Sequence, residues 1–236
     1  MPRPPQLYKN HSAPAPIHPV ELFEGRVSIN WDYLIERRPL VLETHEDLPA
    51  YLLLPEINQI LDVTTHARTH LLFNTLWHTG ARISEALALT PESFTLRDEW
   101  SSCVVLDTLK QRGRPKKGSK NTKKRMVPIT DLVFLREIKS YLETHACKPG
   151  ERLFSFTPQW AGKLLNKSTA LLQTPLSMKI SPHTFRHSFA CNAILHGEPL
   201  TVVRDWLGHS HVETTEIYTA ILSSETNHLM RYMRFS

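Results

Sequence analysis

The chain has 236 residues, 41% of them hydrophobic, which is enough to bury a core in one large domain or two small ones. Its three cysteines, Cys103, Cys147 and Cys191, lie far apart and exclude a disulfide framework or a zinc ribbon. The net charge of +5 indicates an anionic partner, and the lack of a long apolar run excludes a signal peptide and a membrane span, so we predict a cytoplasmic protein with no membrane partner.

The first 47 residues are rich in proline and lack sustained periodicity. This composition is typical of an extended or partly ordered arm, in which we predict at most a short helix over residues 28–37. A folded domain is predicted over residues 48–236.

Helices dominate the predicted domain. Before residue 91 they are predicted over residues 55–61, 70–77 and 82–89, the second ended by Gly80. After residue 131 they are predicted over residues 132–142, 161–172, 182–195 and 200–207. Between the two groups lie strand-like runs at residues 103–106 and 126–129. The sequence therefore predicts a mainly α fold with a small antiparallel β-sheet or hairpin.

A strongly basic segment separates the two strand-like runs. Residues 110–125 contain no acid and nine bases: Lys110, Arg112, Arg114, Lys116, Lys117, Lys120, Lys123, Lys124 and Arg125. Since the whole chain has 28 bases and 23 acids, the 19 bases elsewhere leave the remainder acidic. We predict that this segment forms the tip of a long hairpin and contacts nucleic acid; a solvated loop is the alternative.

Two stretches place phosphate-binding or titratable groups at helix ends. Arg82 opens a helix and Glu85 lies one turn later on the same face, where its carboxylate can orient the guanidinium. A surface ion pair is the alternative. Gly208 and His209 follow a helix end, and Tyr218 comes nine residues after His209, so an imidazole and a phenol can share a site if the turn folds back. A half-buried aromatic side chain is the alternative for Tyr218.

A third stretch places His183 and Arg186 in the first turn of a helix. Residues three apart point together, and a helix N-terminus with an arginine suits a phosphate. His183 and His187 have the i,i+4 spacing of zinc ligands. However, Thr184 stands where the zinc-hydrolase motif has Glu, so we do not favour a metal site.

The order of these residues resembles the catalytic set of the tyrosine recombinases, the phage-integrase family. The set comprises Arg82, a lysine in the following hairpin, His183-x-x-Arg186, Leu207-Gly208-His209 and Tyr218, and the resemblance runs from about Leu48 to Tyr218. It implies the catalytic-domain fold of DNA breaking and rejoining enzymes. It also implies transfer of DNA strands through a 3′-phosphotyrosine, with no metal, cofactor or ATP, by a protein associated with the nucleoid or a plasmid.

The resemblance also implies a role for each residue. Arg82 and Arg186 would clamp the scissile phosphate, because guanidinium groups match its oxygens and neutralise the charge of the transition state. His209 would donate a hydrogen bond to the same oxygens. His183 would accept the proton of Tyr218, the nucleophile.

Two further residues complete the set that the family implies. Glu85 would support the arginines from behind. The leaving 5′-oxygen would take its proton from a hairpin lysine, and we choose Lys110 because it directly follows the incoming strand. The hairpin lysines left as alternatives are Lys116, Lys117, Lys123 and Lys124.

Three features differ from the family pattern or extend it. Only the proline-rich arm stands where most members have a DNA-clamping domain, so we expect accessory DNA-bending proteins. Residues 112–117 resemble an AT-hook, which predicts contact with a narrow minor groove, with plain phosphate contact as the alternative. The amphipathic tail at residues 223–235 would dock on a neighbouring protomer of a synaptic tetramer, or pack on its own core.

Three other functions are alternatives to recombination. A type IB topoisomerase uses the same residue set, but the small size and the spacing from His209 to Tyr218 favour a recombinase. A DNA-binding regulator would require the loss of a catalytic residue. A zinc hydrolase would require a full set of ligands. The sequence does not choose between integration, inversion and resolution of plasmid multimers.

Overall fold

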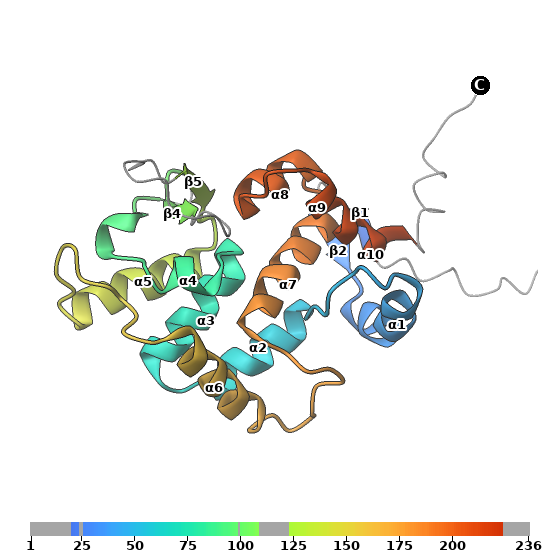
Figure 1. The fold of residues 1–236 in the computed structure, drawn as a ribbon, viewed down its shortest axis with the longest axis horizontal. Helices are drawn as coiled ribbons and strands as arrows, with labels where there is room; N and C mark the ends of the chain where they lie inside the picture. The colour runs from blue at the N-terminus through green and yellow to red at the C-terminus, as the bar shows by residue number, and fades with distance from the viewer. Residues whose placement is uncertain (1–19, 24–25, 99, 109–122, 224–236) are drawn as a thin grey trace, which may run out of the picture.

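The computed structural model describes residues 20–23, 26–98, 100–108 and 123–223. Its helices are α1 (Trp31–Thr44), α2 (Leu54–Val63), α3 (Ala67–Thr79), α4 (Ile83–Ala86), α5 (Leu132–Thr144), α6 (Pro158–Thr169), α7 (Pro182–Leu195), α8 (Leu200–Leu207), α9 (Glu213–Glu216) and α10 (Ala220–Ser223). The 3₁₀ turns are η1 (Pro91–Ser93) and η2 (Ile217–Thr219), and the strands are β1 (Val20–Phe23), β2 (Arg26–Ile29), β3 (Phe94–Thr95), β4 (Cys103–Thr108) and β5 (Lys123–Pro128). In Figure 1, α7 runs through the middle of the molecule, with α3, α4, α5 and the larger sheet on one side and α1 on the other.

The larger sheet is antiparallel, in the order β3-β4-β5. On β4 and β5, Val104 pairs with Val127 and Leu106 pairs with Arg125, and all four are buried. Residues two apart on a strand share a face, so Arg125 faces the core whereas Lys124 is exposed. This pairing confirms the predicted mainly α fold with a small antiparallel sheet. The basic hairpin tip lies outside the described residues.

Two glycines end helices in the left-handed region that favours glycine. Gly80 follows α3 with φ 58°, and Gly208 follows α8 with φ 66°. At Gly80 a β-carbon would lie only 2.5 Å from Cδ1 of Phe189, so α7 packs closely against this turn. Both helix ends lie beside α7, because Arg186 of α7 donates to the Gly80 carbonyl and to the Leu207 carbonyl.

Two hydrophobic clusters meet at α7. The larger packs α2, α3, α5, α6 and the sheet together, and it includes Phe185 of α7. The second joins α1, α7, α8 and η2, and it includes Leu34 and Tyr218. A buried ion pair ties α1 to α2, because Nη1 and Nη2 of Arg38 donate to the two carboxylate oxygens of Glu56 at 2.5 and 2.7 Å.

The N-terminal region is more ordered than the sequence predicted. We predicted at most a short helix over residues 28–37, but α1 is a helix of 14 residues that ends at Thr44. Asn30 caps its start by accepting a hydrogen bond from the amide of Tyr33 at 3.1 Å. Leu34 and Val41 are buried, so packing stabilises a helix whose own sequence signal is weak.

The helix predicted over residues 82–89 is also wrong in length. Only Ile83–Ala86 form α4. The amides of Ala88 and Leu89 donate to carbonyls three residues back, at 3.1 Å each, so the chain tightens into a turn before Pro91. This turn directs Leu89 into the core.

Candidate active site

Arg82 and Glu85 form a pair at the start of α4. One carboxylate oxygen of Glu85 accepts from the Arg82 amide at 2.8 Å, and the other accepts from Nη1 of Arg82 at 3.0 Å. The carboxylate is fully buried, while 18% of the Arg82 side chain is exposed. The pair is therefore no surface ion pair: a buried anion holds a guanidinium that still reaches the surface.

Arg125 approaches the same carboxylate from β5. Its Nη2 and Nη1 donate to the two oxygens of Glu85 at 2.6 and 3.1 Å, and its Nε donates to the Trp206 carbonyl at 2.7 Å. We predicted that Arg125 contacts DNA on the hairpin surface. In the described conformation, strand alternation turns the side chain inward and protein acceptors take up most of its donors.

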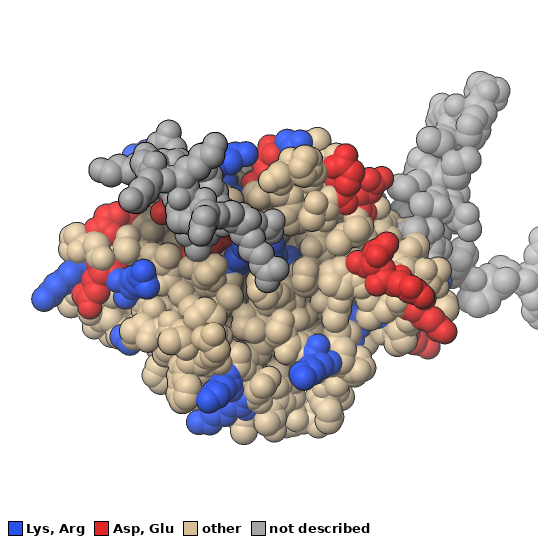
Figure 2. Space-filling view, viewed as in Figure 1, with Lys and Arg blue, Asp and Glu red and all other residues tan. Residues whose placement is uncertain are grey.

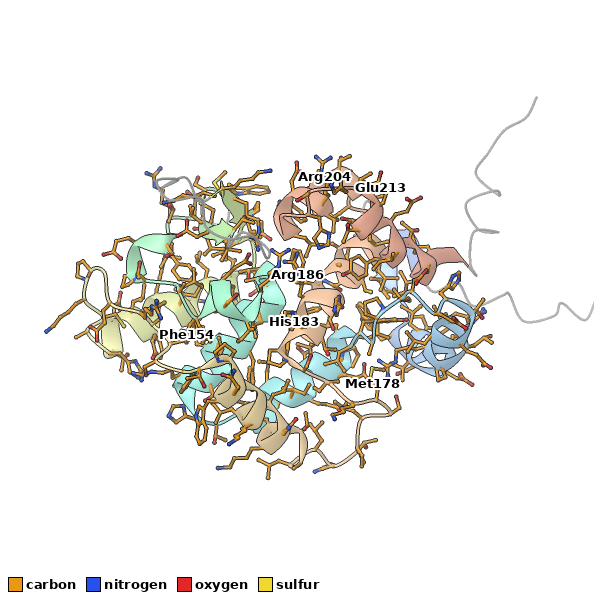
Figure 3. All side chains as sticks on the ribbon, in the orientation of Figure 1. Phe154, Met178, His183, Arg186, Arg204 and Glu213 are labelled. Carbon is orange, nitrogen blue, oxygen red and sulfur yellow. The ribbon has the colours of Figure 1, made fainter. Side chains whose placement is uncertain are left out.

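Arg186 lies between the ends of α3 and α8. Its Nη1 donates to the Gly80 carbonyl and its Nη2 donates to the Leu207 carbonyl, both at 2.7 Å. In Figure 3, Arg186 lies above His183 on α7. Burial, together with the positive charges of Arg82 and Arg125, lowers the pKa of Arg186 to about 9.

These groups make a site for an anion. Three guanidinium groups, those of Arg82, Arg125 and Arg186, lie close enough to repel one another, and in the described part of the chain Glu85 is the carboxylate that faces them. Burial raises the pKa of Glu85, but hydrogen bonds and charge from Arg125 and Arg82 outweigh it, so the net shift is downward. The excess positive charge matches a phosphodiester.

Tyr218 lies on η2 with its ring almost entirely buried. Its hydroxyl is hydrogen-bonded to Nδ1 of His187 at 2.8 Å. Burial and the neighbouring Cys191 raise the pKa of the phenol, so it holds its proton at neutral pH. Burial and the charge of Arg186 lower the pKa of His187 to about 4, so this ring is neutral and, with its proton on Nε2, can accept the phenol proton.

The sequence assigned that role to His183, and the geometry does not support it. His183 is exposed, at the start of α7, and the hydrogen bond to the Tyr218 hydroxyl comes from the ring one turn later, His187. Partial burial and the charges of Arg186 and Arg82 lower the pKa of His183. We had considered His187 only as a zinc ligand; its i,i+4 spacing from His183 was the signal that it shares that face of the helix.

His209 follows Gly208 at the end of α8. Its Nδ1 is hydrogen-bonded to the Thr215 hydroxyl at 2.9 Å. This contact fixes the ring through one of its two nitrogens. Burial and the charges of the three arginines lower its pKa to about 3, so the ring is neutral. The turn between α8 and η2 folds back, so that His209 lies close enough to His187 for the two rings to interact electrostatically.

Other predicted site residues lie on or beyond β5. Lys123 and Lys124 are described and exposed, and Lys124 faces Asp107 at 4.0 Å. The remainder lie outside the described residues: Lys110, Arg112, Arg114, Lys116, Lys117 and Lys120. The tail is described only as far as Ser223.

The described residues hold neither a cluster of metal ligands nor a helix that could span a membrane. Within residues 20–23, 26–98, 100–108 and 123–223, no three His, Cys, Asp or Glu side chains cluster as metal ligands would. No helix in the same ranges has the length and apolar character needed to cross a membrane.

Comparisons with known proteins place the chain in one family. The model of the phage integrase family matches residues 51–225. A probable site-specific recombinase in the afa region of Escherichia coli is 34% identical over 180 residues, covering 74% of this chain and 72% of that protein. An Escherichia coli protein named resolvase is 32% identical over 234 residues, covering 89% of this chain and 88% of the relative.

Solved structures show the same fold. A XerH site-specific recombinase bound to its difH substrate superposes with a TM-score of 0.59 at 25% identity, over 75% of this chain and 52% of that one. This chain thus spans about half the length of the XerH chain. The XerA recombinase superposes with a TM-score of 0.61 at 22% identity, over 80% and 67% of the two chains. The chain belongs to the phage integrase family and is a site-specific tyrosine recombinase, an enzyme that transfers DNA strands.

Proposed function

We propose that Tyr218 is the nucleophile and that His187 takes its proton. The observation that carries this proposal is the 2.8 Å hydrogen bond between the Tyr218 hydroxyl and Nδ1 of His187, one residue after Arg186. A phenol that keeps its proton needs a base at contact distance in order to attack phosphorus. As Oη of Tyr218 bonds to phosphorus, the phenol proton passes to His187 and the bond from phosphorus to the 5′-oxygen breaks.

Arg82, Arg186 and His209 would hold the non-bridging oxygens. Charge on these oxygens grows in the pentavalent transition state, and fixed donors stabilise it most where water is excluded. Each guanidinium is already fixed by protein acceptors, Arg82 by Glu85 and Arg186 by two carbonyls. Fixed groups need no reorganisation during the reaction, which lowers the barrier.

The leaving 5′-oxygen would take a proton from Lys110 on the hairpin. The product is a 3′-phosphotyrosine and a free 5′-hydroxyl. Attack by a 5′-hydroxyl then reverses the chemistry and releases Tyr218. The phosphotyrosine conserves the energy of the broken bond, so no nucleotide is consumed.

A covalent adduct tests the reaction. Purified protein is mixed, in EDTA and without ATP, with nicked suicide duplexes tiled across DNA that flanks its gene, and SDS-resistant adducts are resolved on a gel. We expect an adduct with the natural chain and none with Tyr218→Phe. An adduct that survives Tyr218→Phe would disprove the nucleophile, and one that needs metal would disprove the mechanism.

DNA would approach the arginines and avoid the acidic side of the molecule. Figure 2 shows acidic side chains over α9 and the end of α1. Glu46, Asp47, Glu213 and Glu216 line a groove there. Phosphates would be repelled from this groove and attracted to the excess positive charge around Arg186. We further propose that four protomers assemble on paired sites, with DNA-bending accessory proteins where the arm does not clamp the duplex.

Resolution is the outcome that we propose for the recombination. Support comes from the two Escherichia coli relatives that are named resolvase, which match 89% and 84% of this chain. A plasmid with two directly repeated copies of the site should yield two smaller circles. If inverted repeats recombine as efficiently as direct repeats, the chain is no dedicated resolvase.

A further inference from the structure

Arg125 joins three separate segments of the chain, two of which carry active-site residues, although it lies at the base of the basic hairpin. It donates to Glu85 at the start of α4, to the Trp206 carbonyl at the end of α8, and to the hydroxyl of Thr108 on β4 at 3.1 Å. Four of its five N–H donors therefore have protein acceptors. Only 8% of the residue is exposed, in a strand whose preceding residues, Lys123 and Lys124, are exposed.

A buried guanidinium with this many partners fixes the groups to which it donates. Glu85 uses the same two oxygens to hold Arg82, at 3.0 Å from Nη1 and 2.8 Å from the amide. Without Arg125 the carboxylate would keep a single cationic partner and could rotate toward it. The position of Arg82 therefore depends on Arg125 through Glu85.

The second contact of Arg125 reaches the turn that carries His209. Trp206, whose carbonyl accepts from Nε, precedes Leu207, whose carbonyl accepts from Arg186. A β-carbon at Gly208 would lie 2.9 Å from Cδ of Arg125, so the arginine packs directly against this turn. Two adjacent carbonyls are thus held by two different arginines.

We propose that Arg125 is a positioning residue that fixes Arg82 through Glu85 and fixes the Leu207-Gly208-His209 turn through the Trp206 carbonyl. It does not touch the phosphate; it sets the geometry of the groups that do. The inference rests on the proposed function, because it assumes that Arg82 and His209 bind the scissile phosphate. Arg125 also connects the two strands of the basic hairpin to Arg82 and His209, since Thr108 lies on β4 and Arg125 lies on β5.

The test compares Arg125→Lys and Arg125→Ala with the natural chain in single-turnover cleavage of a saturating suicide duplex. Lysine keeps the charge, but its ammonium cannot reach both the carboxylate and the carbonyl as the planar fork does. We expect cleavage to fall about 100-fold, the size of effect that a misplacement of about 1 Å produces, while the Kd for DNA changes less than about threefold. Millimolar guanidinium should restore part of the activity of Arg125→Ala by filling the vacated space.

A matched control separates positioning from stability. Arg38 makes a similar buried pair with Glu56, between α1 and α2. Arg38→Lys should lower the melting temperature about as much as Arg125→Lys, but leave the cleavage rate per folded molecule unchanged. Equal loss of cleavage in both variants would overturn the inference, because loss of stability would then explain it.

A double-mutant cycle tests the route through Glu85. Glu85→Gln keeps the shape of the side chain but removes its charge. Combined with Arg125→Lys, it should lower cleavage no more than about threefold beyond the worse single variant, because residues that act as one unit are not additive. Fully multiplying effects, or Arg125 variants that cleave like the natural chain, would overturn the inference. If the natural chain itself forms no adduct, it is the proposed function that fails.

Discussion

At the scale of single residues, the two histidines of α7 differ in what they contact. His187 touches the Tyr218 hydroxyl, whereas His183 is exposed at the helix start. We expect His187→Gln to lower the rate of cleavage about 100-fold at neutral pH, the lower end of what a general base contributes. His183→Gln should lower it less. Single-turnover rates from pH 4.5 to 8 measure both, and the reverse order would restore the sequence-based assignment of His183 as the base.

His187 and His209 should make the free protein sensitive to acid. Burial and the charge of Arg186 lower the pKa of His187 to about 4 and that of His209 to about 3. An unfolded histidine takes up a proton near pH 6.5, so the unfolded state binds protons that the folded state does not. These groups contribute stability that is fully present above about pH 6.5 and is lost as the pH falls toward 4. Melting temperatures should fall across this window.

Glutamine variants check the origin of that pH dependence. His187→Gln and His209→Gln should each flatten the decline of the melting temperature between pH 6.5 and 4.5, since glutamine does not titrate. A decline that is unchanged in both variants would assign the effect to other groups.

The sequence predicted which residues gather at the site better than what each one does there. Arg82, Glu85, Arg186, His209 and Tyr218 were all named from their order along the chain, and the fold brings them together. Arg125 was grouped with the exposed bases of the hairpin because the net charge of a segment does not show which way a strand side chain points. Arg125 lies two and four residues before the apolar Val127 and Ile129, and this period of two indicates that all three side chains face the core.

At the scale of elements, many of the site residues lie at helix ends. Replacing Gly208, the glycine that follows α8, tests whether the turn at that helix end matters for cleavage. Gly208 and Gly197 both have positive φ, 66° and 80°. An alanine at either position costs about 1–2 kcal/mol of backbone strain. At Gly208 the new β-carbon would also meet Arg125, whereas nothing lies within 4 Å at Gly197. We expect both variants to lose stability in urea unfolding, Gly208→Ala more than Gly197→Ala, but only Gly208→Ala to lose cleavage. Equal cleavage would mean that Arg125 shifts without consequence.

Elements with strong local signals were predicted almost in full. The helix predicted over residues 200–207 matches α8, and the one predicted over 182–195 matches α7. Both have an amphipathic or apolar run and a clear end. The prediction over residues 82–89 failed because a tight turn toward the core interrupts the helix, and such turns depend on tertiary packing that a local pattern does not encode.

At the scale of the whole molecule, contacts between distant segments hold α1 and the segment that follows it, up to α2, in place. The amide of Leu52 donates to the Ser188 hydroxyl at 2.7 Å across 136 residues, and Arg38 pairs with Glu56. A single sequence does not reveal such partners. For this reason the domain boundary that we predicted at Leu48 rested on composition, and α1 before it was not recognised as part of the core.

We propose that the folded unit begins before Leu48 and includes α1. Leu34 is 6% exposed and packs in the cluster that also contains Tyr218, whereas Leu40 of the same helix is 54% exposed. Leu34→Ala should therefore lower the free energy of unfolding by about 2–5 kcal/mol, because it leaves a cavity in a packed core. Leu40→Ala, on the exposed face, should change it by less than about 0.5 kcal/mol. Urea unfolding measures both. If the two variants are equally stable, α1 is a dispensable arm, and a chain that starts at Leu48 should retain full stability. If the variants differ as expected, the chain that starts at Leu48 should lose part of the packing that surrounds Tyr218.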